Sequence, residues 1–275
     1  RKNSKMPLLQ IFILAAIQGI TEFIPISSSG HLILLPEFFD WNDQGLLVDV
    51  AVHIGTLFAV IIYFWRDIFK ITSSVYHKTF LRRKSTKTDK NFKLLLNLGI
   101  ATLPIIPAGY IINYYSGDIL RSMEVIGWAT IVFAIFLLLA DKVCMTVRKL
   151  DHISYSGALL IGLFQIMALI PGTSRAGITI TAARLLGVEK QDAAKFSMLL
   201  SIPVIAAAGA LKLVDAYTIR DTGIIMDLVE VASLTFIIAL ATIFIFLRWL
   251  KNSGFTPFVV YRLILGGVII LFAYQ

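Results

Sequence analysis

Two apolar stretches of this chain are too long for one upright membrane span, and polar residues interrupt both. They cover residues 8–35 and 155–186, and the interruptions are IPISSSGH at 24–31 and IPGTSRAG at 170–177. A polar group buried in hydrocarbon without a partner costs several kcal/mol, so these residues need a cavity, a ligand or one another. Each stretch is therefore expected to be a helix that breaks inside the membrane and continues as a second helix.

The rest of the chain is also apolar. Of its 275 residues 57% are hydrophobic and 15% are charged, and the mean hydropathy is +0.82, which excludes an ordinary soluble globular protein. Six further segments approach the roughly 20 residues that cross a bilayer once. They are 47–65, 94–112, 124–140, 193–211, 229–247 and 256–274.

The positive charge is concentrated in one stretch. Residues 66–93 hold nine of the 25 Lys and Arg residues of a chain whose net charge is +8. A basic loop between apolar spans is typical of the cytoplasmic side and its anionic lipids, so membrane lipids are the expected surroundings and nucleic acid is not an expected partner. The single cysteine, Cys144, excludes a disulfide framework and a CxxC metal site.

The charges of the loops also predict the topology. With 66–93 inside, the loop after residue 35 lies outside, and it carries Glu37, Asp40 and Asp43 without Lys or Arg. The later loops keep this sense only if 155–186 leaves the membrane on the side where it entered. The predicted fold is an all-α integral membrane protein with six transmembrane helices and two re-entrant helical hairpins.

The two halves then repeat one unit with opposite orientation, which is an inverted-topology repeat. Within a single membrane domain, 1–275, the first repeat covers 7–140 with its hairpin at 8–38, and the second covers 155–275 with its hairpin at 155–186. Superposing the prolines of the two interruptions, Pro25 and Pro171, aligns Ser27, Ser28 and Ser29 with Thr173, Ser174 and Arg175.

The first interruption contains acidic and amide side chains. Gln18 and Glu22 are four residues apart, which places them on one face of a helix that leads to the break at Pro25. A glutamate facing lipid would be costly, so Glu22 must face a cavity, a cation or a partner.

The second helix of this hairpin is expected to begin near Gly30 and end near Phe38. Its N-terminus then lies deep in the membrane, where the free N–H groups and Ser27, Ser28 and Ser29 form an anion site. The alternative is that the serines only cap the helix.

Histidines near this hairpin are further candidates. His31 lies in the first turn of the second helix, where it can take a proton or attack phosphorus, unless it is simply a packed, hydrogen-bonded residue. His53, in the following span, is a secondary candidate for the same cavity.

The second hairpin supplies positive charge. Arg175 follows Ser174 at the start of a helix, and a guanidinium is a fork-shaped ligand for phosphate. Its alternative role is an ion pair with Glu22, which is compatible with ligand binding. Three other cations lie near predicted segment ends and are expected to reach the headgroups by snorkelling, namely Lys195, Arg184 and Arg262.

Several motifs together resemble a known family. QGITEFIPISSSGH, VHIGTLFAVIIYFWRD, PGTSRAG and TPFVVYR occur in this order, and they are similar to the signatures of the bacterial undecaprenyl pyrophosphate phosphatases of the bacitracin-resistance type. The resemblance covers nearly the whole chain. Ala176 stands where that family commonly has serine, and Gln18 where it permits Glu or Gln.

The resemblance implies removal of the terminal phosphate of undecaprenyl pyrophosphate, which recycles the lipid carrier for peptidoglycan synthesis and confers bacitracin resistance. It implies a plasma-membrane enzyme whose site opens to the outer, periplasmic face, with a homodimer as an expected assembly. The roles it implies are Glu22 and Gln18 at a divalent cation, Mg²⁺ or Ca²⁺, or in proton transfer, Ser27, Ser28 and His31 at the reaction centre, and Thr173, Ser174, Arg175, Ser29 and Gly30 on the pyrophosphate.

Two questions stay open at this point. The attacking group is Ser28 activated by His31, or His31 itself, or water oriented by either residue. The alternative function is a lipid-phosphate flippase or transporter that uses the same anion site, because inverted repeats with re-entrant hairpins are common in transporters.

Overall fold

The computed structural model describes residues 6–39, 41, 45–80, 86–115, 119–144, 146–216 and 222–275. Within these ranges the chain is helical and forms no β-sheet; a single isolated bridge pairs Arg148 with Val188. The expected loop residues Asp40 and Asp43 lie outside the described residues. In chain order the helices are α1 Leu8–Thr21, α2 Ser28–Phe39, α3 Gly45–Tyr63, α4 Trp65–Thr79, α5 Thr86–Thr102, α6 Ile105–Tyr115, η1 Ile119–Arg121, α7 Met123–Val143, η2 Leu150–His152, α8 Tyr155–Gln165, η3 Ile166–Leu169, α9 Arg175–Leu185, α10 Lys190–Ala216, α11 Thr222–Trp249 and α12 Thr256–Ala273.

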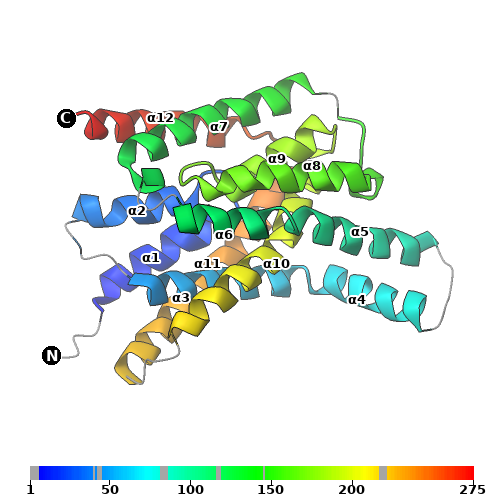
Figure 1. Ribbon diagram of the computed structural model, residues 1–275, viewed down its shortest axis with the longest axis horizontal. Coiled ribbons are helices and arrows are strands. Elements are labelled where there is room, and N and C mark those ends of the chain that lie inside the picture. The colour runs from blue at the N-terminus through cyan, green and yellow to red at the C-terminus, as the bar shows by residue number, and fades with distance from the viewer. Residues whose placement is uncertain are drawn as a thin grey trace.

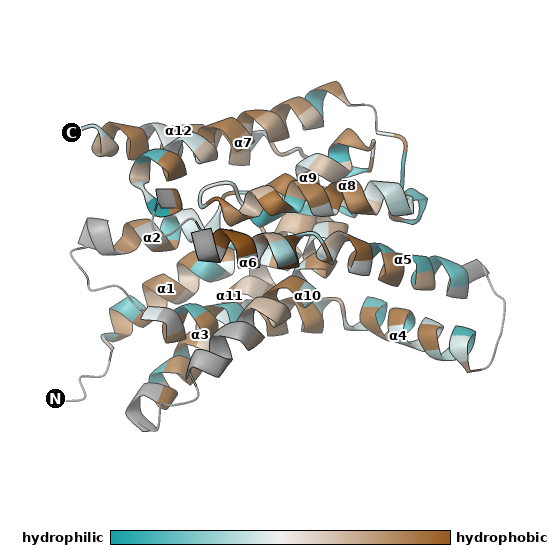
Figure 2. Cartoon of the chain, viewed as in Figure 1, coloured by the Kyte–Doolittle hydropathy of each residue, from teal (hydrophilic) through white to brown (hydrophobic). Residues whose placement is uncertain are grey.

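Helices of membrane-spanning length and composition are present. Among the described residues, five helical segments are long and apolar enough to cross a membrane, and a bent pair brings the number to six. Figure 2 shows hydrophobic residues along most of α7 and α8. Both predicted breaks also occur, since α1 and α2 are separated by residues 22–27, and α9 is separated from α8 and η3 by residues 170–174. The prediction of an all-α membrane protein is confirmed at this level.

The sequence predicted a loop at the basic stretch 66–93, but part of this stretch is helical. Its first part is α4, which turns by 74° from α3 after Phe64. In Figure 2 hydrophilic and hydrophobic residues alternate along α4. This amphipathic pattern buries Ile71 and Ser74 while the lysines stay outside, so a search for continuous apolar runs missed the helix.

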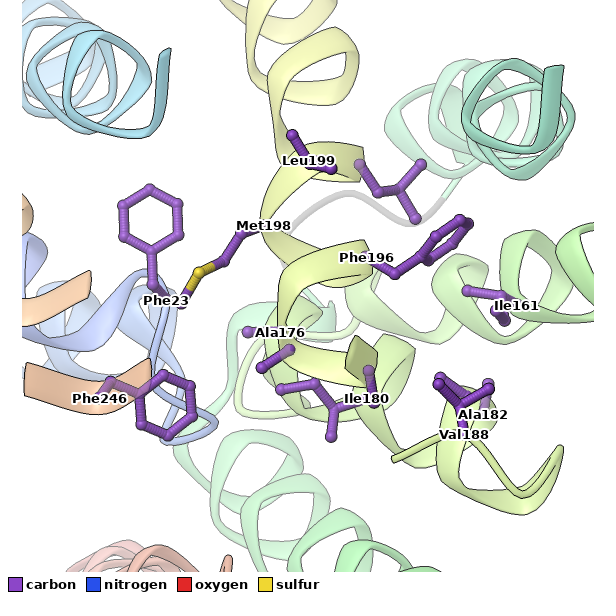
Figure 3. Close-up of a cluster of buried hydrophobic side chains, with 14 of the residues drawn as sticks. Phe23, Ile161, Ala176, Ile180, Ala182, Val188, Phe196, Met198, Leu199 and Phe246 are labelled. Atoms are coloured by element: carbon purple, nitrogen blue, oxygen red, sulfur yellow. The ribbon is translucent and has the colours of Figure 1, made fainter. Parts of the chain in front are cut away.

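Helices from the two halves of the chain pack against one another. α3 packs along α11 and α7 along α12, and the second pair lies side by side in Figure 1. At the first contact Gly55 is required, because a Cβ there would lie 2.4 Å from the carbonyl oxygen of Ala232. The core extends to the first break, where buried Phe23 lies beside Met198 of α10 (Figure 3). This packing fixes the position of the neighbouring Glu22.

Candidate active site

The two breaks end in the same local structure. Ser27 and Ser174 each directly precede a helix, and they are the described non-glycine residues with positive φ, 76° and 68°. The hydroxyl of Ser27 accepts a hydrogen bond from the N–H of Gly30 at 3.3 Å, and that of Ser174 accepts from Gly177 at 3.1 Å. Each serine is therefore an N-cap held in a strained backbone conformation.

This geometry shifts the predicted alignment of the two motifs by one residue. Ser27 corresponds to Ser174, not to Thr173, and Ser28 therefore corresponds to Arg175. The second break has one more residue between its proline and its cap. Only glycine fits at Gly172, which adopts φ 91° and where a Cβ would lie 2.4 Å from the carbonyl oxygen of Ile126. Matching the prolines was wrong because the caps, not the prolines, begin the helices.

An ion pair joins the two hairpins. Arg175 donates from Nη2 to Glu22 Oε1 at 2.6 Å and from Nη1 to the carbonyl oxygen of Ser197 at 3.1 Å. Glu22 Oε2 accepts from Gln18 Nε2 at 2.9 Å and from Ser28 Oγ at 2.8 Å. The Glu22 side chain is 6% exposed and that of Arg175 12%, so the pair is largely buried. Its charges compensate one another where either alone would be costly.

A cavity of about 230 Å³ opens at this ion pair. Its polar lining brings together residues from both hairpins and from α3, namely Thr21, Glu22, Ser28, Ser29, Asp49, His53, Ser174 and Arg175. The N-terminal ends of α2 and α9 meet at the cavity, and the first N–H groups of a helix have no partner within it. A guanidinium, hydroxyls and two helix N-termini suit the binding of a phosphate anion.

Other predicted site residues lie behind this lining. Gln18 and Thr173 are both 0% exposed, and Gly30 is buried against the second break, where a Cβ would lie 3.6 Å from Gly172 Cα. Gln18 reaches the site through its hydrogen bond to Glu22.

His31 also lies outside the cavity lining, as does Ser27. Its Nδ1 lies 2.6 Å from the carbonyl oxygen of Ser27, and its Nε2 lies 2.6 Å from the hydroxyl of Tyr261. The hydroxyl of Ser28 instead contacts Glu22. His53, the secondary candidate, does line the cavity, with Nε2 3.9 Å from Glu22 Oε2.

Arg262 holds the two breaks together, a role that the sequence analysis missed. It is 0% exposed, so the expectation that it reaches the headgroups was wrong. Its Nη2 donates to the carbonyl oxygens of Gly172 and Thr173, both at 2.9 Å, and its Nη1 to that of Pro25 at 3.5 Å. The available signal was an arginine inside the predicted span 256–274, where a buried charge needs a partner within the protein.

The other two cations expected to snorkel are also paired within the protein. Arg184 is 1% exposed and lies 3.3 Å from Asp141, while Lys195 forms a 2.7 Å salt bridge with Asp67. Segment ends on α9 and α10 are covered by neighbouring helices, which is a tertiary property that hydropathy does not report.

The donors at the cavity fit a divalent cation only in part. Glu22 supplies a carboxylate, and the buried Oε1 of Gln18 has no hydrogen-bond partner. Within the described ranges, however, there is no group of three His, Cys, Asp or Glu residues that could hold a metal. Mg²⁺ commonly binds through one or two carboxylates plus substrate phosphates, so a cation here would need phosphate oxygens to complete its coordination.

Comparison with known proteins identifies the family of this chain. Residues 11–268 match the family described as bacitracin resistance protein BacA. The chain is 46% identical to undecaprenyl-diphosphatase of Roseobacter denitrificans over 98% of this chain and all of that protein. It is 44% identical to undecaprenyl-diphosphatase of Hahella chejuensis, over 98% of this chain and 99% of that protein. It is 41% identical to undecaprenyl-diphosphatase 1 of Rhodospirillum rubrum, over 98% and 96%. The chain belongs to the BacA family of bacitracin resistance proteins.

Proposed function

We propose that this protein is a membrane phosphatase that hydrolyses undecaprenyl pyrophosphate, the diphosphate in its relatives' name, to undecaprenyl phosphate and inorganic phosphate. The observation that carries the proposal is the Glu22–Arg175 pair, with Ser28 bonded to the same carboxylate, at a cavity between two helix N-termini. Recycling of the lipid carrier for peptidoglycan synthesis, and hence bacitracin resistance, follows from this reaction.

Substrate binding is proposed to release Glu22. The phosphate groups compete with Glu22 for the guanidinium of Arg175, which can offer a forked pair of N–H donors to phosphate oxygens. The N–H groups at the starts of α2 and α9 add partial positive charge. Once Arg175 turns to the phosphate, the Glu22 carboxylate loses its strongest partner and becomes a better base.

Ser28 is the proposed nucleophile, because its hydroxyl already donates to Glu22 at 2.8 Å. Its Oγ attacks the terminal phosphorus and its proton passes to Glu22. The bond from that phosphorus to the bridging oxygen breaks, and the lipid phosphate leaves with the proton from Glu22. Water then attacks the phosphorus of the phosphoserine and gives a proton to Glu22. The bond from phosphorus to Ser28 Oγ breaks, Oγ takes the proton from Glu22, and inorganic phosphate leaves.

His31 has a positioning role in this scheme. Its contacts with the Ser27 carbonyl and the Tyr261 hydroxyl support the start of α2, which carries Ser28. A divalent cation, Mg²⁺ or Ca²⁺, would be held by Glu22 and Gln18 together with substrate oxygens, and it would neutralise charge on the pyrophosphate.

The topology proposed for the membrane is six spans and two re-entrant hairpins in an inverted repeat. Two features support it: the matching caps at Ser27 and Ser174, and an exchanged packing in which α1 lies on α11 and α8 lies on α5. In this arrangement the site opens to the outer face of the plasma membrane. A homodimer stays a prediction.

The test is phosphate release from undecaprenyl pyrophosphate by the purified protein in detergent, with Mg²⁺, with Ca²⁺ and with chelator. Ser28→Ala, Glu22→Gln and Arg175→Ala should abolish release, and Lys142→Ala, an exposed change at the end of α7, should not. A trapped phosphoserine would identify the nucleophile. If folded wild type binds the lipid and releases no phosphate, but moves it across vesicles, the flippase alternative replaces this proposal.

A further inference from the structure

A second cavity, of about 280 Å³, lies away from the candidate active site between α4, α5, η2 and α10. In Figure 1, α4 and α5 run together on the side of the molecule away from the C-terminus. The ionic lining consists of four lysines and three aspartates, namely Lys90, Lys93, Lys149, Lys195, Asp67, Asp151 and Asp192. Nothing in the phosphatase scheme uses it.

The aspartates of this cavity already have partners. Asp67 pairs with Lys195 at 2.7 Å, and Asp192 Oδ2 accepts from the N–H of Leu150 at 2.8 Å. Asp151 pairs with Lys90, and the hydrogen bond from that lysine lowers the pKa of the Asp151 carboxyl below its ordinary value, so it stays ionised at neutral pH.

Two lysines therefore remain without a carboxylate. Lys93 donates to the carbonyl oxygen of Asp151 at 3.0 Å, and Lys149 is exposed at the rim. Neither takes part in a salt bridge among the described residues. With four lysines and three aspartates, the ionic lining carries one net positive charge, which an anion would neutralise.

The cavity also has an unused hydrogen-bond acceptor. Asn97 lines it and is 1% exposed; its Nδ2 donates to the carbonyl oxygen of Ile153 at 3.0 Å, while its Oδ1 is buried without a partner. An unsatisfied buried acceptor costs about 1–3 kcal/mol, so a ligand that donates a hydrogen bond there would be favoured.

The surroundings place the cavity at a membrane surface. α4 turns 74° away from α3, as a helix does when it leaves a span to lie along the interface. Trp65, Phe69 and Tyr76 are exposed on it, and Trp and Tyr are enriched at the level of the headgroups. The guanidinium of Arg66 lies 5.3 Å from the centre of the Trp65 ring.

We propose that this cavity binds the headgroup of an anionic phospholipid that carries a hydroxyl, of the phosphatidylglycerol type. Lys93 and Lys149 bind the phosphate, and a headgroup hydroxyl donates to Asn97 Oδ1. The same cations would also attract free phosphate, so the test must separate the two sources.

Native mass spectrometry of the detergent-solubilised protein, titrated with phosphatidylglycerol, measures the binding. Lys93→Ala and Lys149→Ala should each weaken binding about fivefold, because a lysine near a membrane surface contributes about 1 kcal/mol. Lys142→Ala is the matched exposed control and should change nothing. Arg175→Ala should also retain this binding, which separates the site from the candidate active site.

Two further probes decide what is recognised. Phosphatidylmethanol has the same charge as phosphatidylglycerol but no headgroup hydroxyl. It should therefore bind wild type more weakly than phosphatidylglycerol does, whereas the two lipids should bind the Asn97→Leu variant equally well. Inorganic phosphate should not compete at millimolar concentration. If inorganic phosphate competes with phosphatidylglycerol, and Lys93→Ala and Lys149→Ala weaken the binding of phosphate as much as that of the lipid, free phosphate is the ligand and the lipid is excluded. Equal phosphatidylglycerol binding by wild type and both lysine variants would overturn the site altogether.

Discussion

Glu22 and Arg175, 153 residues apart in the sequence, share a 2.6 Å hydrogen bond that joins the two broken helices. Either charge would be costly if it were buried without the other. Further hydrogen bonds hold each side chain, from Gln18 and Ser28 to Glu22, and from Arg175 to the Ser197 carbonyl oxygen. The ion pair therefore holds the two hairpins together, and in the proposed reaction the phosphate of the substrate breaks it.

Glu22→Gln should lose activity and stability together. The variant leaves the Arg175 guanidinium buried without its counter-ion, which typically costs about 3–5 kcal/mol. Loss of the general base should lower kcat by about 10²–10⁴. Thermal unfolding in detergent and phosphate release measure the two effects. The double variant Glu22→Gln/Arg175→Met should recover stability but not activity; recovery of both would exclude Glu22 as the base.

Arg175→Lys should be nearly inactive although it keeps the charge. Arg175 contacts Glu22 and the Ser197 carbonyl oxygen with two different nitrogens of its planar guanidinium. The single ammonium group of lysine cannot make both contacts, and it cannot bind two phosphate oxygens in the same geometry. We expect a loss of about 10²–10³ in kcat. A variant within threefold of wild type would show that only charge is needed at this position.

Substitutions at Ser27 should separate capping from catalysis. Ser27→Ala loses the cap and keeps a side chain at positive φ, whereas Ser27→Gly relieves the strain and costs only a few tenths of a kcal/mol as a cap. The Ser27→Gly variant should therefore have a higher Tm than the Ser27→Ala variant, and it should retain most of the wild-type activity. An inactive but stable Ser27→Gly protein would instead make Ser27 a reacting group. Ser174→Gly and Ser174→Ala provide the same stability comparison in the second hairpin.

Arg262→Met should disconnect the two breaks without touching the cavity lining. It removes hydrogen bonds to the buried carbonyl oxygens of Gly172 and Thr173. The Gly172 oxygen keeps a 3.3 Å hydrogen bond from the Thr130 hydroxyl, whereas loss of the bond to Thr173 costs about 1–3 kcal/mol if that acceptor is left unsatisfied. We expect a lower Tm and a lower kcat, with partial recovery of both in Arg262→Lys. Unchanged kinetics in a stably folded Arg262→Met protein would show that the clamp is not needed for the geometry of the site.

Tight binding of a divalent cation should require the substrate. Because the described residues contain no three-residue metal cluster, a cation should bind tightly only with the pyrophosphate present. Calorimetry should therefore show weak Mg²⁺ binding to the protein alone and strong binding with a non-hydrolysable pyrophosphate analogue. Tight binding to the free protein would point to a site outside the described residues.

The sequence by itself determined the class of fold and the main polar residues of the site. Long apolar runs allow only helices in a membrane, and the positions of Glu22, Ser28 and Arg175 within two such runs indicated a buried anion site, because isolated polar groups there are too costly. The helical break in each run was predictable for the same reason.

Only the tertiary structure decided which side chains meet. The ring nitrogens of His31 contact the Ser27 carbonyl and the Tyr261 hydroxyl, while Ser28 contacts Glu22, a difference set by rotation about one helix that spacing alone does not specify. Arg262 and Arg184 are buried because neighbouring helices cover them. Hydropathy records how apolar a segment is, whereas burial of a charge depends on partners from distant parts of the chain, and those become neighbours only when the helices pack.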